Sequence, residues 1–371
     1  MIKSMSLKRR LKLCCLGLAR AFGLFALARV MTAHRLRILC YHGFGDDDAI
    51  EFSPGLFMRL ETVRRRFELV RRRGYHVMSL GAAVEALATN HLPRLPLVIT
   101  FDDGFYSNLS GSRALVEEFA LPITLYVTSY YVVKKTPIFS HAVRYLFFKT
   151  HHTMLSLAGL AGHSRSSWPD ELNLGDRAST ERHMWSLIMD GETHMSESER
   201  VELCRELGRR LGVDYDKLAV ERRLSMLSAE EILELDRIGV DIQLHTHRHV
   251  MPLDPQALQR EIEDNRAVLE SATGKLCVHL CYPSGVYCEA HWPTMRTLGI
   301  RSATTCEPGL NRAGTEPYRL ARFLDFEQRS DLEIDAALSG ILELPRWVQN
   351  LWSQPKVATN HDVNHPREYD G

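Results

Sequence analysis

The chain has 371 residues, of which 45% are hydrophobic and 25% are charged. This length and composition are typical of one large domain with a sizeable buried core and some added segments. Its 46 lysines and arginines balance its 46 aspartates and glutamates, so the formal net charge is zero and no general attraction to nucleic acid is expected.

The N-terminal segment, residues 1–35, is predicted to form a basic amphipathic helix. A group of basic residues precedes an apolar run at residues 13–30, which Arg20 interrupts. The interruption and the lack of a small-residue cleavage site argue against a signal peptide, and they also argue against a membrane-spanning helix. We expect residues 8–31 to lie on a membrane surface, with a helix packed against the domain as the alternative.

Residues 36–130 are predicted to alternate strands with helices. The opening strand ends at His42, and apolar residues spaced three and four apart predict a helix over Gly55–Arg73. A strand is expected to resume at residues 75–78, and another is expected at Ile123–Thr128.

The strand predicted at Leu97–Phe101 ends in two adjacent carboxylates, Asp102 and Asp103. Gly104 then lets the backbone turn sharply. Parallel sheets place their chemistry at the carboxyl ends of their strands, so this turn is a candidate functional site. An ordinary Asx-type turn is the alternative.

A long segment, residues 131–226, is rich in helix formers and charge. Helices are predicted at Val143–Phe148 and Glu197–Leu211. The Ser- and charge-rich stretch at His163–Thr180 is predicted to be a loop. We interpret the segment as a helical insertion, which acts either as a lid over the strand ends or as a decorative subdomain.

Residues 227–345 return to the alternation of strands and helices. A capping box at Ser228–Glu231 begins one helix, and Pro255 lies at the start of another. Further strands are predicted at Cys277–Tyr282 and Arg301–Thr305. Repeated units of this kind predict a parallel α/β barrel.

A strand in this second half, beginning at Val240, ends in His245, and His249 follows four residues later. Carboxylate and imidazole are ligands that a zinc-like ion uses in hydrolytic sites, where three protein ligands leave one position open. Since strand ends converge on one face of a parallel barrel, one acid and these two histidines are expected to meet.

Together these motifs resemble those of the NodB-homology polysaccharide deacetylases, the carbohydrate esterases of family four. The two defining motifs are Thr-Phe-Asp-Asp-Gly at residues 100–104 and His-Thr-x-x-His at residues 245–249. The resemblance covers roughly residues 36 to 325. Further matches lie at residues 38–42, 227–233 and 282–285. The resemblance implies a distorted parallel β/α barrel interrupted by the helical insertion.

By this resemblance, the metal ligands are Asp103, His245 and His249, and the general base is Asp102. The chemistry agrees, because a bound cation lowers the pKa of water and polarises an amide carbonyl while a neighbouring carboxylate accepts the proton. Between the two histidine ligands, Thr246 is expected to fix the loop geometry. His247 has no matching role, and we expect it to face solvent.

The chain departs from the family pattern in two places. No arginine precedes the turn that begins at Tyr282, where the family uses one to orient the catalytic carboxylate, and the Leu-x-His motif that supplies the general acid is missing. The first and last strands of a closed barrel are neighbours, so we take His42 as the candidate acid, with simple packing beside the metal as the alternative. His291 is a weaker candidate. Tyr282 and Ser284 are assigned to the oxyanion or the substrate, Ser284 through its backbone amide.

These assignments predict a metal-dependent hydrolase that removes N-acetyl groups from an N-acetylhexosamine-containing poly- or oligosaccharide, with zinc as the expected cofactor. A neutral carbohydrate partner is compatible with the zero net charge. An O-acetyl esterase on glycans and an amidase on a small non-sugar substrate are alternatives. A catalytically silent glycan-binding protein is a further alternative, because the arginine and the acid motif are missing.

The eight cysteines show no disulfide framework and no Cys-x-x-Cys zinc site. Cys40, Cys277 and Cys281 lie in predicted strands, where free cysteine behaves as a small apolar residue. We therefore expect reduced thiols and a cytoplasmic protein, located in the cytoplasm or at the inner membrane face, with secretion as the alternative. Residues 346–371 form a polar tail that is predicted to be disordered from about Ser353.

Overall fold

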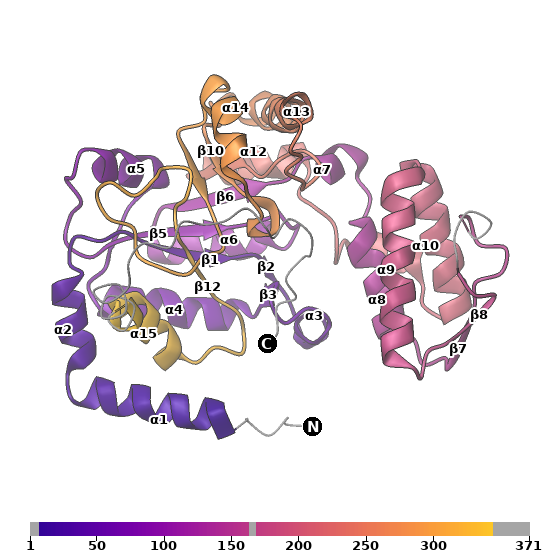
Figure 1. Ribbon diagram of the computed structural model, residues 1–371, viewed down its shortest axis with the longest axis horizontal. Helices are drawn as coiled ribbons and strands as arrows, with labels where there is room; N and C mark the ends of the chain where they lie inside the picture. The colour runs from indigo at the N-terminus through magenta and orange to yellow at the C-terminus, as the bar shows by residue number, and fades with distance from the viewer. Residues whose placement is uncertain (1–6, 163–167, 344–371) are drawn as a thin grey trace. The chain divides into compact units, whose positions relative to one another are not determined.

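The computed structural model describes residues 7–162 and 168–343, which divide into two compact units (Figure 1). The larger unit comprises the described residues up to Gly104, Asn108–Ser129 and those from Glu230 onward. The smaller unit comprises Phe105–Ser107 and Tyr130–Ala229. The predicted polar tail, residues 346–371, lies outside the described residues.

The larger unit is built on a parallel sheet with the strand order β11-β10-β9-β6-β5-β1-β12, and β4 pairs with the start of β5. Its strands are β1 (Arg37–Tyr41), β4 (His76–Val77), β5 (Pro96–Phe101), β6 (Ile123–Val127), β9 (Val240–Leu244), β10 (His279–Cys281), β11 (Ser302–Thr304) and β12 (Phe323–Leu324). All residues of β1, β5 and β6 are buried. Strands that are covered on both faces have nearly continuous apolar sequences, so these three strands could be predicted from the sequence.

The two ends of this sheet meet. A parallel bridge joins Thr304 of β11 to Leu320, just before β12, and β12 pairs with β1 through Leu39 and Phe323. The sheet therefore curls into a distorted barrel. This confirms the predicted parallel β/α barrel, in which the first and last strands are neighbours.

Helices cover the outside of this barrel. They are α4 (Leu60–Arg72), α5 (Leu80–Ala88), α6 (Asn108–Phe119), α12 (Ala229–Arg237), α13 (Pro255–Thr273), α14 (Trp292–Thr297) and α15 (Asp331–Ser339). The prediction of a helix from Pro255 is confirmed, since Asp254 caps its start and Gly274 ends it with a left-handed φ of 70°. Short 3-10 turns complete the unit at η2 (Pro283–Gly285), η3 (Glu289–His291) and η4 (Ile341–Glu343).

The helix predicted over Gly55–Arg73 begins later than expected. Residues Phe57–Met58 form the short strand β3, which pairs with β2 (Gly43–Phe44), and α3 (Asp47–Phe52) lies between them. The pairing with β2 outweighs the helical spacing of the apolar residues, because periodicity carries no information on a partner distant in sequence.

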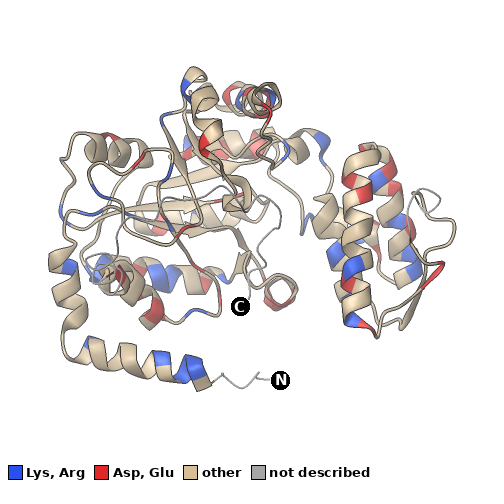
Figure 2. Cartoon of the chain, in the orientation of Figure 1, with Lys and Arg blue, Asp and Glu red and all other residues tan. Residues whose placement is uncertain are grey.

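The N-terminal segment forms two helices, where the sequence predicted one. Helix α1 (Leu7–Ala21) and helix α2 (Leu24–Met31) are separated by Gly23, whose φ of 73° breaks the helix, and the two axes differ by 75°. Basic residues lie mainly in the first half of α1 (Figure 2). Among the described residues, no single helix is long and apolar enough to cross a membrane. Helices α1 and α2 reach the necessary length and apolar composition only when they are taken together, across the bend.

The smaller unit is mainly helical. It contains α7 (Tyr130–Lys134), α8 (Phe139–Lys149), α9 (Arg177–His194), α10 (Glu197–Leu211), α11 (Tyr215–Glu221) and the antiparallel strands β7 (Met154–Ser156) and β8 (Glu171–Asn173). Helix α10 has the predicted bounds, because Ser196 and Glu199 form a capping box and Gly212 ends the helix with a left-handed φ of 69°.

The loop predicted at His163–Thr180 is wrong in its second half. Strand β8 lies there, with Leu172 buried against Leu155 of β7, and α9 begins within it. Residues 163–167 lie outside the described residues. The choice between a lid and a decorative subdomain for this insertion stays a prediction.

Candidate active site

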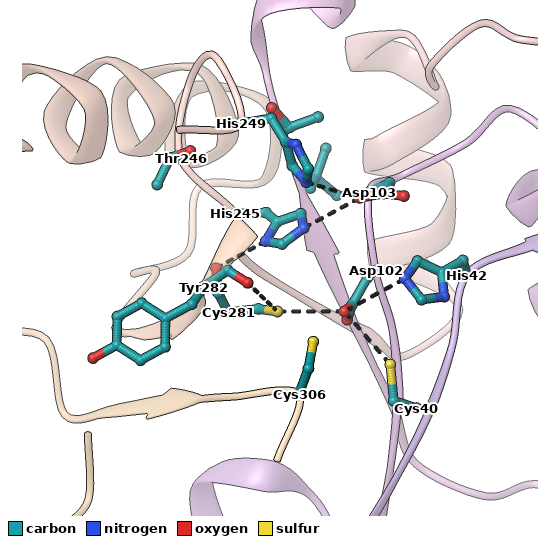
Figure 3. A network of polar contacts seen from close by, with 12 residues as sticks. Cys40, His42, Asp102, Asp103, His245, Thr246, His249, Cys281, Tyr282 and Cys306 are labelled. Atoms are coloured by element: carbon teal, nitrogen blue, oxygen red, sulfur yellow. Dashed lines mark hydrogen bonds and ion pairs between the residues drawn. The ribbon is translucent and has the colours of Figure 1, made fainter. Parts of the chain in front are cut away.

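The carboxyl ends of three central strands place the predicted site residues together (Figure 3). Asp102 and Asp103 follow β5, His245 follows β9, and His42 follows β1. Parallel strands present their carboxyl ends on one side of a barrel, so residues from distant parts of the chain meet there. His249 reaches the same place from the loop after β9.

Asp103, His245 and His249 form one compact group of metal-binding side chains. The Nε2 atoms of His245 and His249 lie 3.1 Å and 3.4 Å from Asp103 Oδ1, and one ligand atom from each residue lies within 4.8 Å of the other two. Burial opposes the ionised form of Asp103, but hydrogen bonds with the two histidines outweigh it and hold the pKa of Asp103 well below its usual range. One carboxylate and two imidazoles suit a divalent ion with an open coordination position.

The environment of His245 leaves the correct nitrogen available for a metal. Its Nδ1 lies 2.8 Å from the carbonyl oxygen of Cys281. A carbonyl oxygen can only accept a hydrogen bond, so Nδ1 must be the donor. Nδ1 therefore carries a proton, and Nε2 faces Asp103, where it donates a hydrogen bond to the carboxylate and where a metal ion would take the place of that proton. Asn265 of α13 accepts a hydrogen bond from the backbone N–H of His245 and fixes the strand end.

Strained backbone holds this group in place. Asp103, Thr246 and His249 all have positive φ, at 72°, 60° and 59°. Gly104 follows with φ of 83°, and an added Cβ there would lie 2.8 Å from Val127. Non-glycine residues adopt left-handed backbone at a cost, and such positions concentrate at functional sites. The hydroxyl of Thr246 accepts a hydrogen bond from the Val250 N–H, so Thr246 fixes the loop as predicted.

Asp102 is held by a buried arginine that the sequence analysis missed. Arg322 donates from Nη1 to Asp102 Oδ1 at 2.7 Å and from Nη2 to Asp102 Oδ2 at 2.8 Å. Burial by itself would raise the pKa of Asp102, but the charge and hydrogen bonds of Arg322 outweigh it and lower the pKa to about 2. The arginine that seemed to be missing before Tyr282 is supplied from the residue preceding β12.

Two thiols complete the surroundings of Asp102. The Sγ atoms of Cys40 and Cys281 lie 3.5 Å and 3.3 Å from Asp102 Oδ2. Burial raises the pKa of both thiols, so they keep their protons and donate to the carboxylate. Asp102 also belongs to two alternative groups of possible metal ligands, with Cys40 and His42 or with His245 and Cys281. The Arg322 charge beside Asp102 disfavours a cation there, so the group around Asp103 is the better metal site.

His42 lies beside Asp102, with its Nε2 4.0 Å from Asp102 Oδ2. Its Nδ1 is buried and has no hydrogen-bond partner among the described residues. The structure thus brings the candidate acid next to the candidate base. His291 is buried elsewhere, where its Nδ1 accepts a hydrogen bond from the Cys288 N–H at the start of η3.

The remaining predicted residues behave differently. The hydroxyl of Tyr282 donates to the Tyr318 carbonyl and its N–H donates to the Thr304 carbonyl, while its ring points away from the metal-binding group in Figure 3. Ser284 is exposed in η2 with a positive φ of 53°. Their roles with the oxyanion or the substrate stay predictions. His247 does not face solvent as expected, because it is half-buried and its Nδ1 lies 2.9 Å from Ser129 Oγ.

The strand ends of this parallel barrel join two histidines to one of two adjacent aspartates, which is the arrangement expected from the sequence. The sequence profile of the polysaccharide deacetylase family matches residues 211–303, which include His245 and His249. The predicted resemblance to this family is confirmed over these residues. No curated protein sequence matches the chain significantly.

Several solved structures share the fold. The deacetylase PplD of Streptococcus pyogenes, solved in complex with acetate, has 15% identity and a TM-score of 0.52, over 84% of this chain and 98% of its own. IcaB from Ammonifex degensii has 16% identity and a TM-score of 0.51, over 83% and 97%. A de-N-acetylase from Aggregatibacter actinomycetemcomitans has 13% identity and a TM-score of 0.50, over 82% and 99%.

Proposed function

We propose that the protein is a metal-dependent hydrolase that removes N-acetyl groups from an N-acetylhexosamine-containing poly- or oligosaccharide and releases acetate. The observation that carries this proposal is the adjacency of a three-residue metal-binding group to an ionised aspartate. Asp103, His245 and His249 would hold a zinc ion, whose chemistry is to acidify a water molecule and polarise the acetyl carbonyl. The relatives named above as deacetylases support the same chemistry.

The protein's own residues divide the proton transfers. Asp102, kept ionised by Arg322, accepts a proton from the attacking water. His42 delivers a proton to the departing nitrogen from the neighbouring strand end. An amine leaves only when it is protonated, whereas an alcohol leaves more readily, so the histidine beside the base favours N-acetyl over O-acetyl substrates.

Acetate release from N-acetylglucosamine oligomers by zinc-reconstituted protein tests this function, with Asp102→Asn assayed under the same conditions. Release by the parent protein and loss in the variant are expected. Elemental analysis gives a readout independent of turnover: the parent protein and Asp102→Asn should hold zinc, and Asp103→Ala should not. Full zinc content in Asp103→Ala would contradict the ligand assignment, and faster release from O-acetylated glycans would favour the esterase alternative.

We also propose that the protein works in the cytoplasm. Support comes from its eight cysteines, all of which are free in the structure. Thiol labelling of intact and of permeabilised cells with a membrane-impermeant reagent tests this location, because Cys14 and Cys15 are exposed: labelling only after permeabilisation is expected, and labelling of intact cells would contradict it.

A further inference from the structure

Helices α1 and α2 present a continuous set of exposed apolar side chains. On α1, Leu7, Leu11 and Leu18 are 83%, 65% and 55% exposed, and their spacing of four and seven residues places them on one face of the helix. The exposed residues continue through the bend onto α2. We define the N-terminal apolar face as Leu7, Leu11, Leu18, Phe22, Leu24, Leu27, Val30 and Met31.

The opposite side of these helices is fastened to the barrel. Leu16 and Phe25 are buried in a hydrophobic cluster with Ala336 of α15. Ion pairs add to this contact: Lys12 lies 3.1 Å from Glu333, and Arg29 lies 3.0 Å from Asp335. Helices α1 and α2 are therefore part of the folded larger unit. Because these contacts fix one side of the two helices, the N-terminal apolar face on the other side stays exposed.

The border of this face is basic. Helices α1 and α2 contain no acidic residue, and Figure 2 shows lysine and arginine positions mainly in the first half of α1. Lys8 and Arg10 lie on either side of Leu7 and Leu11 around this helix. Arg9 and Lys12 pair with Glu333, whereas Lys8 and Arg10 form no ion pair with a described residue. Unpaired guanidinium groups suit a phosphate headgroup.

We propose that the N-terminal apolar face docks the protein onto an anionic lipid bilayer, with the apolar side chains in the headgroup boundary and the basic residues on lipid phosphates. Basic amphipathic helices lie parallel to the membrane surface, because this orientation buries their apolar side chains while their basic residues contact lipid phosphates. Spanning is disfavoured, because the 15 residues of α1 extend about 22 Å against a hydrocarbon core of about 30 Å. A second copy of the chain fits less well, since a symmetric contact would bring like charges together.

Vesicle flotation of the full chain tests this docking, with phosphatidylcholine vesicles compared with vesicles that also contain phosphatidylglycerol. We expect the parent protein to float with the anionic vesicles, and added salt to weaken the binding. Leu11→Asp/Leu18→Asp should reduce the partition coefficient by at least about tenfold. Removing one basic residue, as in Lys8→Ser or Arg10→Ser, should reduce it by about fivefold on anionic vesicles only.

A matched control is Val220→Asp/Leu276→Asp, which adds the same two charges at apolar residues that are 83% and 76% exposed outside α1 and α2. This variant should bind as the parent does, and all variants should keep the parent's thermal unfolding midpoint, since the replaced side chains are exposed. A parent protein that never floats, or a Leu11→Asp/Leu18→Asp variant that binds equally well, overturns the proposal. Light scattering that shows a dimeric parent and a monomeric double variant also overturns it, because a second copy then covers this face.

Discussion

Replacing Arg322 with methionine tests whether a buried guanidinium keeps the catalytic carboxylate ionised. The Arg322 side chain is 0% exposed and that of Asp102 is 4% exposed, and two charge-assisted hydrogen bonds join them. Removing one partner of such a pair leaves an uncompensated buried charge, which costs about 3–5 kcal/mol. Urea unfolding of Arg322→Met at neutral pH should show a loss of this size in the free energy of unfolding.

The same substitution should shift the pH dependence of catalysis. With Arg322 present, the pKa of Asp102 is about 2 and the base is ionised at every pH above that value. Without Arg322, burial is opposed only by the weaker effects of His42, His245 and the two thiols, so the pKa of Asp102 rises. The acid limb of the kcat/KM profile for N-acetylglucosamine oligomers should therefore move to higher pH, with activity lost as the pH falls through the raised pKa.

Two variants control this experiment. Arg319→Met removes a half-exposed arginine that pairs with Glu307 at the surface, and it should cost less than about 1 kcal/mol. Arg322→Met/Asp102→Asn removes both buried charges and should recover part of the lost stability. The reasoning is refuted if Arg322→Met is as stable as Arg319→Met and keeps the parent's acid limb.

Three further outcomes are expected. His42→Gln should lower kcat/KM on N-acetylated sugars by roughly 10²–10⁴-fold but change 4-nitrophenyl acetate hydrolysis little, because a phenolate leaves without a proton; equal losses on both substrates would exclude the acid role. His249→Ala should reduce bound zinc, measured by elemental analysis, without unfolding the barrel, since His249 lies on a half-buried loop; unchanged zinc would remove His249 from the ligand set. Burial lowers the pKa of His279 to about 4, so the unfolded chain binds a proton first as the pH falls below about 6.5, and the free energy of unfolding should drop by about 3 kcal/mol between there and pH 4. His279→Asn should flatten this dependence in urea unfolding at several pH values, and a curve as steep as the parent's would show that other groups cause it.

The sequence was sufficient to predict that Asp103, His245 and His249 meet; their role as metal ligands stays a prediction. Asp103 and His245 each follow a buried strand, and parallel barrels bring strand ends to one side whatever their separation in sequence. The local sequence pattern thus identified the residues, and the general topology of parallel barrels predicted that they lie together. His42 was placed beside Asp102 by the same argument, from the adjacency of the first and last strands.

The partner of Asp102 was beyond this reasoning, because it depends on how the barrel closes. Arg322 lies 220 residues from Asp102, and no local motif connects them. One signal was present: Arg322 interrupts the otherwise apolar residues 320–324, and arginine is rarely fully buried unless it is paired. Strands β3 and β8 were missed for a related reason, since each depends on a partner strand that the local pattern does not identify.

The separation of Asp102 from Arg322 also bears on how the protein is made. The chain leaves the ribosome from its N-terminus, so β5 is synthesised long before the guanidinium that neutralises its terminal carboxylate. Until residue 322 emerges, burying Asp102 means burying an unpaired charge or a protonated acid. The centre of the barrel therefore has a reason to remain unfolded during most of synthesis, and the last strand completes the fold and the base together.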